Sequence, residues 1–135
     1  MKLRKTGIFL LFLGTLLTGC TSQPEASLPL VTRVQISGQL QDAPFSSQYT
    51  DPDKMEAILR YLRGLKTGGA PDTDPERIMG SHYRICIYRS DGTCHIYRQQ
   101  ADRYLSVDSR PWKKIPPKKA LRLAGLLKTL PPDHF

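Results

Sequence analysis

Hydrophobic and polar residues alternate with a period of two along residues 30–40. Val34, Ile36 and Leu40 are separated by polar side chains, a pattern that is typical of a half-buried β-strand. Residues 41–49 fit either a loop or a return strand. We therefore expect the folded part of the chain to begin with a strand that turns one side to the core.

Two later segments have the helical period, with apolar residues three and four positions apart. Asp51 is a suitable N-cap for the first helix, and Pro52 suits its first turn. We expect this helix to stop at Gly68 and Gly69. The second helix is expected to start near Pro117. The apolar stripes are Met55, Ile58, Leu59, Leu62 and Leu65 in the first helix, and Ala120, Leu123, Ala124, Leu127 and Leu130 in the second.

Residues 83–99 predict a β-hairpin that turns at Asp91-Gly92. This dipeptide favours a two-residue type I′ turn, which would pair Ile87 with Ile96 and Cys86 with Tyr97. The register then separates a core face from an outer face. The expected core face consists of Ile85, Ile87, Cys94 and Ile96, and the expected outer face of Arg84, Cys86, Tyr88, His95, Tyr97 and Gln99.

Further short strands are expected at residues 104–107 and 112–115, whereas the proline-containing, acidic residues 70–80 predict a surface loop. The predicted order is β-α-β-β-β-α. Because each helix has one apolar face, the economical arrangement is an α+β fold. It has a small antiparallel sheet of about four to five strands, with two helices packed on one face.

The N-terminal segment has the organisation of an export signal. Three basic residues precede an apolar run of about 11 residues, which is shorter than the roughly 20 that a membrane-spanning helix needs. The run ends in Leu17-Thr18-Gly19-Cys20, which resembles the lipobox of bacterial lipoproteins. The resemblance implies that residues 1–19 are a cleaved signal peptide and that Cys20 carries the lipid. The protein would then be anchored to the cell membrane and face its extracytoplasmic side.

Residues 20–29 are polar, contain two prolines and predict a flexible tether, so that residues 30–135 form a single domain. The chain has 20 Lys and Arg against 12 Asp and Glu, and the excess of positive charge is concentrated from Arg98 onward. Such charge in a cytosolic protein would suggest a nucleic-acid partner, but the export signal argues against one. A solvated face is the favoured interpretation, and weak attraction to an anionic membrane surface is the alternative.

The helix at residues 53–59, the hairpin at 85–97, the tyrosine strand at 103–105 and Trp112 form a sequence of structural motifs. In this order, the body resembles small uncharacterised lipoproteins of Gram-positive, Firmicutes-type bacteria. The resemblance spans residues 50–130. It implies a shared arrangement of elements and supplies no catalytic residues.

Two cysteines, Cys86 and Cys94, remain once Cys20 is lipidated. In the expected register they project from opposite faces, so a disulfide between them would mean that the register is wrong. Cys94 is expected in the core, and Cys86 as an exposed or half-covered thiol. Cys86 and His95 would share a face on a diagonal, which leaves a thiol nucleophile as the enzymatic hypothesis.

No metal site or cofactor is expected. His82 and Cys86 lie four residues apart on one strand, about 13 Å, which is too far to share a zinc ion. The acidic residues between 72 and 76 lack the calcium-loop pattern. His134 belongs to a tail that follows two prolines.

The outer sheet face is the expected binding surface, because tyrosine and arginine are enriched at interface hot spots. The residues expected to form it are Arg84, Tyr88, His95 and Tyr97. The expected function is that of a non-catalytic binding or accessory module of the cell envelope, with an envelope protein or a wall polymer as its partner. The alternatives are a small envelope enzyme that uses Cys86 and His95, and a purely structural lipoprotein.

Overall fold

The computed structural model describes residues 29–40 and 42–133. The expected signal peptide, the expected lipid-attachment residue Cys20, most of the expected tether and His134 lie outside the described residues. The strands are β1 (Val31–Leu40), β2 (Ala43–Tyr49), β3 (His82–Arg89), β4 (Cys94–Gln100), β5 (Tyr104–Val107) and β6 (Lys113–Lys114). The helices are α2 (Pro52–Arg63), the 3₁₀ helix η1 (Pro75–Arg77), α3 (Pro117–Ala120) and α4 (Arg122–Thr129).

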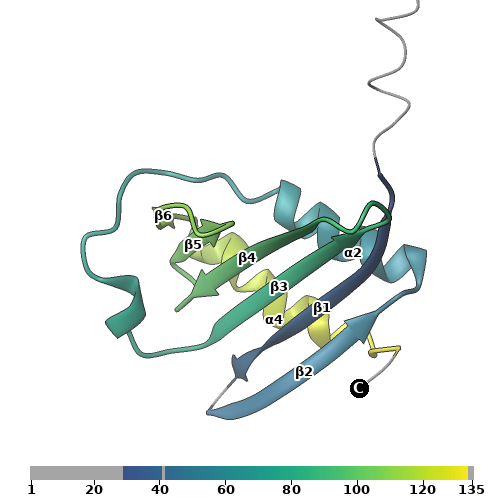
Figure 1. Cartoon of the computed structure of the whole chain (residues 1–135). Coiled ribbons are helices and arrows are strands. Elements are labelled where there is room, and N and C mark those ends of the chain that lie inside the picture. The colour runs from purple at the N-terminus through teal and green to yellow at the C-terminus, as the bar shows by residue number, and fades with distance from the viewer. Residues whose placement is uncertain (1–28, 41, 134–135) are drawn as a thin grey trace, which may run out of the picture. The chain divides into compact units, whose positions relative to one another are not determined.

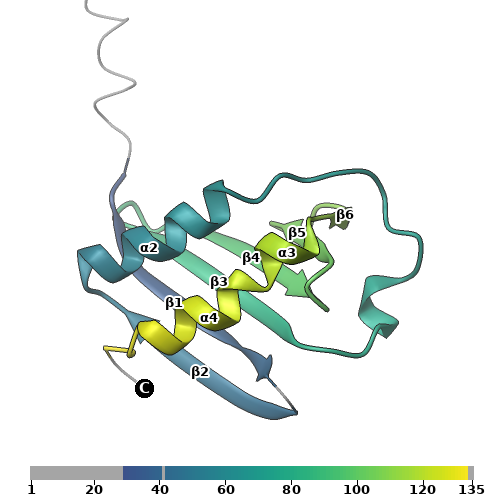
Figure 2. The same cartoon turned by 180° about the vertical axis from the view of Figure 1, so that it is seen from behind.

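The described strands form one antiparallel sheet in the order β2-β1-β3-β4-β5-β6. Figures 1 and 2 show α2 and α4 on the same side of this sheet, which we call the helix side; the other side is the open face. The α+β class is therefore confirmed. The expected strand count and order are wrong, because residues 43–49 form a return strand beside β1 and the sheet has six strands.

The centre of the core lies between β1, β3 and the helices. Val34 and Ile36 have no exposed surface, and they oppose Ile87 and Ile85 on β3. Directly opposed residues in an antiparallel pair point to the same side, so all four side chains face the helices. The expected half-buried first strand is thus confirmed.

The predicted start of α2 is confirmed, and its predicted end is wrong. The Asp51 carboxylate accepts a hydrogen bond from the Asp53 N–H at 2.8 Å, as an N-cap does. The helix ends at Arg63 instead of continuing to the glycine pair. Gly68 N–H donates to the Lys114 carbonyl at 2.7 Å, and Lys114 N–H donates to the Gly69 carbonyl at 3.0 Å, so the glycines run beside β6.

The last helical region is divided into α3 and α4, which meet at Leu121. Ala120 and Leu123 are fully buried, as the predicted apolar stripe requires. The chain then returns to the start of α2, where the Asp133 carboxylate accepts the Asp51 N–H at 2.8 Å and pairs with Lys54 at 2.7 Å. The two helical regions are therefore held together at one end.

The loop expected at residues 70–80 is confirmed, with η1 inside it. Its Glu76 forms an ion pair with Arg98 at 3.0 Å, and Ile78 accepts a hydrogen bond from Gln100. Both partners lie on β4, so the loop is fastened to the sheet. No helix in the described part of the chain is long and apolar enough to span a membrane.

Candidate functional site

The β3–β4 hairpin turns through three residues instead of two. Arg89 N–H donates to the Thr93 carbonyl at 3.0 Å, and Gly92 N–H donates to the Arg89 carbonyl at 3.0 Å. Gly92 has a φ of 87°, whereas Asp91 does not have a positive φ. This combination describes a type I turn followed by a left-handed glycine, not the expected type I′ turn.

The longer turn shifts the register by one residue, so the predicted pairing is wrong. Ile87 pairs with His95, Ile85 with Tyr97, and Tyr83 with Gln99. Since Tyr83, Ile85 and Ile87 are buried on the helix side, their three partners on β4 face the same way. Cys94 and Ile96 consequently occupy the open face, where the two-residue turn would have placed His95 and Tyr97.

The four residues expected to form a binding surface are divided between the two sides of the sheet. Arg84 and Tyr88 lie on the open face, as expected, with Tyr88 stacked under the Arg33 guanidinium at 4.0 Å. Tyr97 instead packs against the helix-side core. His95 lies at the solvent-exposed margin of the helix side, and its Nδ1 is 2.8 Å from the Asp108 carboxylate. The four side chains therefore do not form one surface.

The proposed cysteine–histidine pair is not formed either. Cys86 lies on the open face and His95 on the helix side. His95 has Asp108 as its partner, and this hydrogen bond is the main cause that holds the pKa of Asp108 below its ordinary value. The expected position of Cys94 in the core is also wrong, because Cys94 is exposed. The half-covered position of Cys86 is confirmed.

The shifted register buries a polar side chain that was expected on the outer face. Gln99 is 1% exposed, and its Nε2 donates to the Ala120 carbonyl and to the Asp102 carboxylate, each at 3.2 Å. Its Oε1 accepts a hydrogen bond from the Tyr61 hydroxyl. Burial raises the pKa of Asp102 and of Tyr61 above their ordinary values. This network ties β4 to α2 and α3 and fixes the Tyr61 ring.

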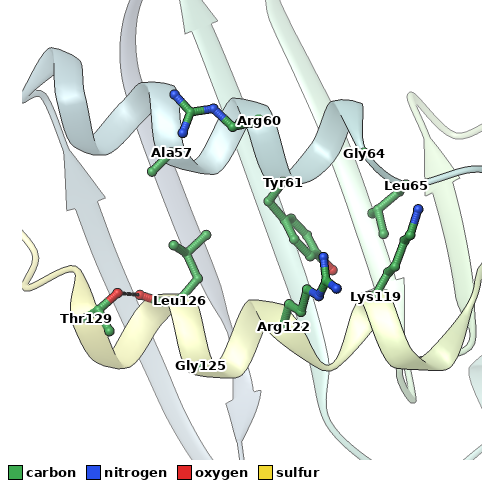
Figure 3. A pocket seen from close by; sticks show the side chains of 10 residues that line it. All are labelled: Ala57, Arg60, Tyr61, Gly64, Leu65, Lys119, Arg122, Gly125, Leu126 and Thr129. Carbon is green, nitrogen blue, oxygen red and sulfur yellow. Dashed lines mark hydrogen bonds between the residues drawn. The ribbon is translucent and has the colours of Figure 1, made fainter.

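A groove of about 550 Å³ runs between α2 and the α3–α4 region, and the Tyr61 ring forms part of its floor. Figure 3 shows Ala57 and Leu126 turned toward the space between the helices, with Leu65 at the other end. Gly64 and Gly125 also line it, and the absence of their side chains leaves the groove open. The floor is therefore largely apolar.

The rim of this groove carries three basic residues and no acidic ones. Figure 3 shows Lys119 and Arg122 extending toward α2, whereas Arg60 projects from α2 away from α4. Among the described residues, none of the three has an ion-pair partner or a side-chain hydrogen bond. By contrast, Lys54 and Arg63 on α2 are both paired. The groove thus combines an apolar floor with positive charge that no described carboxylate neutralises.

No three His, Cys, Asp or Glu side chains among residues 29–40 and 42–133 are grouped so that they could hold a metal ion. Comparisons of the chain with protein-family models, with curated proteins and with solved structures found no significant match.

Sequence reasoning did not identify the groove. Lys119 and Arg122 were included in the basic C-terminal part that was interpreted as a solvated face. The sequence does contain one signal for it: Gly125 follows these cations within a helix, where glycine is unfavourable. This signal can be interpreted only when the packing of α2 against α4 is known, because the packing places Gly125 and the cations beside one groove.

Proposed function

We propose that this protein is a non-catalytic, lipid-anchored binding module on the extracytoplasmic side of a cell membrane. We further propose that the groove between α2 and the α3–α4 region is its ligand site. The anchor is inferred from the lipobox that ends at Cys20. The binding site is inferred from the groove. The main observation is that Lys119 and Arg122, two cations with no ion-pair partner among the described residues, lie beside an apolar floor.

This combination fits an anionic amphiphile, meaning a molecule with one hydrocarbon chain and a carboxylate or phosphate head. The chain would cover Leu65, Leu126 and the Tyr61 ring, and the head would contact Lys119 and Arg122. The volume of about 550 Å³ is within the range of roughly 300–1,000 Å³ that is usual for small-ligand sites. A protein partner would require a contact area of about 800 Å² on each side, which is larger than the surface that a small-ligand groove provides.

A polar wall polymer fits this site less well than an amphiphile does. A polyanion would satisfy the cations but would leave the apolar floor exposed to water, since it has no hydrocarbon to cover it. Amphiphiles with a negatively charged head are abundant at a membrane surface, which is where the proposed anchor would hold the groove. The anchor and the groove are therefore consistent with one role.

The anchor is tested by mass spectrometry of the membrane fraction after expression of the full chain in bacteria. We expect the N-terminal peptide to begin at Cys20 and to carry acyl chains, and Cys20→Ser to remain uncleaved. An unmodified chain, or one cleaved at another position, would contradict the anchor.

The ligand site is tested by photolabelling the membrane-anchored chain with a long-chain fatty acid that carries a diazirine on its hydrocarbon chain. We expect adducts on residues 57–65 and 119–129, and we expect excess palmitate to suppress them. The methyl ester of the same probe serves as the control, because it keeps the chain and loses the charge. Adducts on the open face of the sheet, or equal labelling by the ester, would contradict the site.

A further inference from the structure

Cys86 and Cys94 lie on the same face of the sheet and on adjacent strands. Cys86 pairs with Ile96, and Tyr88 pairs with Cys94, which makes the two cysteines diagonal neighbours. They share the open face with Tyr88, opposite the helices. The three-residue turn is what brings them together, because a two-residue turn would have put them on opposite faces.

The two cysteines occupy positions in the strand ladder where side chains on neighbouring strands are closer than at the alternate positions. Arg89 and Thr93 form a hydrogen-bonded position next to the turn. These positions alternate along an antiparallel pair, so Tyr88 with Cys94 and Cys86 with Ile96 are non-hydrogen-bonded pairs, whose side chains approach most closely. Diagonal neighbours lie about 7–8 Å apart, with their Cβ atoms somewhat closer, so a small shift between β3 and β4 brings the two thiols into disulfide geometry.

The surroundings of Cys94 act on its pKa. Partial desolvation is the largest cause that raises the pKa of Cys94 above its ordinary value, and the neighbouring Cys86 thiol adds to it. Both cysteines are in the free form in this structure, with Cys94 exposed and Cys86 half-buried. Because a raised pKa disfavours the Cys94 thiolate, attack by this thiol on a disulfide is expected to become faster as the pH rises.

We propose that Cys86 and Cys94 are an oxidisable pair that forms an intrachain disulfide across β3 and β4. The oxidant is a disulfide compound, such as a thiol–disulfide oxidoreductase or a small disulfide. The Cys94 thiolate attacks one sulfur of the oxidant, releases the first thiol and forms a mixed disulfide. The Cys86 thiolate then attacks the Cys94 sulfur and releases the second thiol. Overall, the two cysteines lose two electrons and two protons, and the oxidant becomes two thiols.

The order of the two attacks follows from exposure. Cys94 is accessible to a bulky oxidant, whereas Cys86 is half-buried and needs only to reach its neighbour. The resulting disulfide would link β3 and β4 covalently on the open face, next to the hairpin turn. An extracytoplasmic location, as proposed above, is a compartment where such a bond can form and persist.

The test uses the full chain with Cys20→Ser, so that only Cys86 and Cys94 carry thiols. The reduced, folded protein is incubated with oxidised glutathione at neutral pH, alkylated and examined by peptide mass spectrometry. We expect both thiols to become resistant to alkylation and the peptides that contain them to be joined within one chain. Additional Cys86→Ser should leave glutathione attached to Cys94.

The matched control moves one thiol to the other side of the sheet. A chain with Cys20→Ser, Cys94→Ser and His95→Cys has the same number of thiols, but residue 95 faces the helix side. We expect this variant to form glutathione adducts and no intrachain bond. The proposal is overturned if Cys86 and Cys94 both remain alkylatable, if they form only separate adducts, or if the control bridges equally fast.

Discussion

The buried amide of Gln99 offers the sharpest mutational test of the β3–β4 register. Gln99→Met keeps a similar shape but removes the hydrogen bonds to Tyr61, Asp102 and the Ala120 carbonyl. A buried polar group that loses its partner costs about 1–3 kcal/mol. Tyr61 retains a second acceptor, the Ala120 carbonyl at 3.3 Å, and Asp102 is only partly buried, which reduces their share of the penalty. We therefore expect a loss of about 2–3 kcal/mol in the free energy of unfolding.

The assay is urea unfolding of the full chain, followed by the fluorescence of Trp112, the only tryptophan in the sequence. The control is Gln100→Met on the same strand, which removes one hydrogen bond, to the Ile78 carbonyl, at a half-buried position. We expect that control to cost less than about 1 kcal/mol.

A two-residue turn would place Gln99 on the solvated face, where its replacement should have almost no effect. If Gln99→Met stays within about 0.5 kcal/mol of the wild type, or costs no more than Gln100→Met, the register described above is wrong.

Further predictions concern two glycines and the end of the chain. Gly38→Ala should destabilise the protein by more than about 2 kcal/mol in urea unfolding, because a Cβ would lie 2.0 Å from the His82 carbonyl oxygen. Gly125 lies in a helix, and a Cβ added there meets open space, so Gly125→Ala should instead stabilise the protein by up to about 1 kcal/mol. A loss of stability would contradict the described packing. The hydrogen bond from Lys54, followed by those from two backbone N–H groups, lowers the pKa of Asp133, so its stabilising contribution is present above a pH of about 4 and declines below it. Asp133→Asn should reduce this acid-induced fall in the urea midpoint, and an unchanged pH profile would refute the assignment.

Local signals were sufficient to predict much of the fold. The alternation around Val34 and Ile36, the N-cap Asp51 and the apolar stripe of the first helix each depend on residues that are close in sequence. The α+β class followed from these elements, because two amphipathic helices and a half-buried sheet have few ways to cover their apolar faces.

The register could not be predicted because the two possible turns differ in length by only one residue. Asp91-Gly92 is compatible with both a two-residue and a three-residue turn, and the choice reverses the side of every residue on β4. Apolar patterning favoured the wrong answer, because it assigns Gln99 to water and Cys94 to the core. The Gln99 amide is accommodated only because Tyr61, Asp102 and Ala120 satisfy it, and these partners come from three separate parts of the chain.

The groove was missed for a related reason. A cation on an amphipathic helix usually lies on a solvated face, and nothing local distinguishes Lys119 or Arg122 from Lys118 or Lys128. Their difference arises from α2 and the residues just after it, which place Ala57, Tyr61 and Leu65 in the groove with them. The predicted binding face failed because two of its four residues lie on the helix side, and the register decides this.

The central claim is that the charge beside the α2–α4 groove selects an anionic amphiphile. It is tested most directly by the apparent Kd of the diazirine fatty acid, measured by titrating the photolabelling of the membrane-anchored chain. Lys119→Gln with Arg122→Gln should weaken binding about 10-fold or more, if each of the two charges contributes roughly 0.7–1 kcal/mol. Lys118→Gln with Lys128→Gln removes the same net charge outside the groove and should leave the Kd nearly unchanged. Equal weakening by both pairs, or no weakening by the first, would contradict the account.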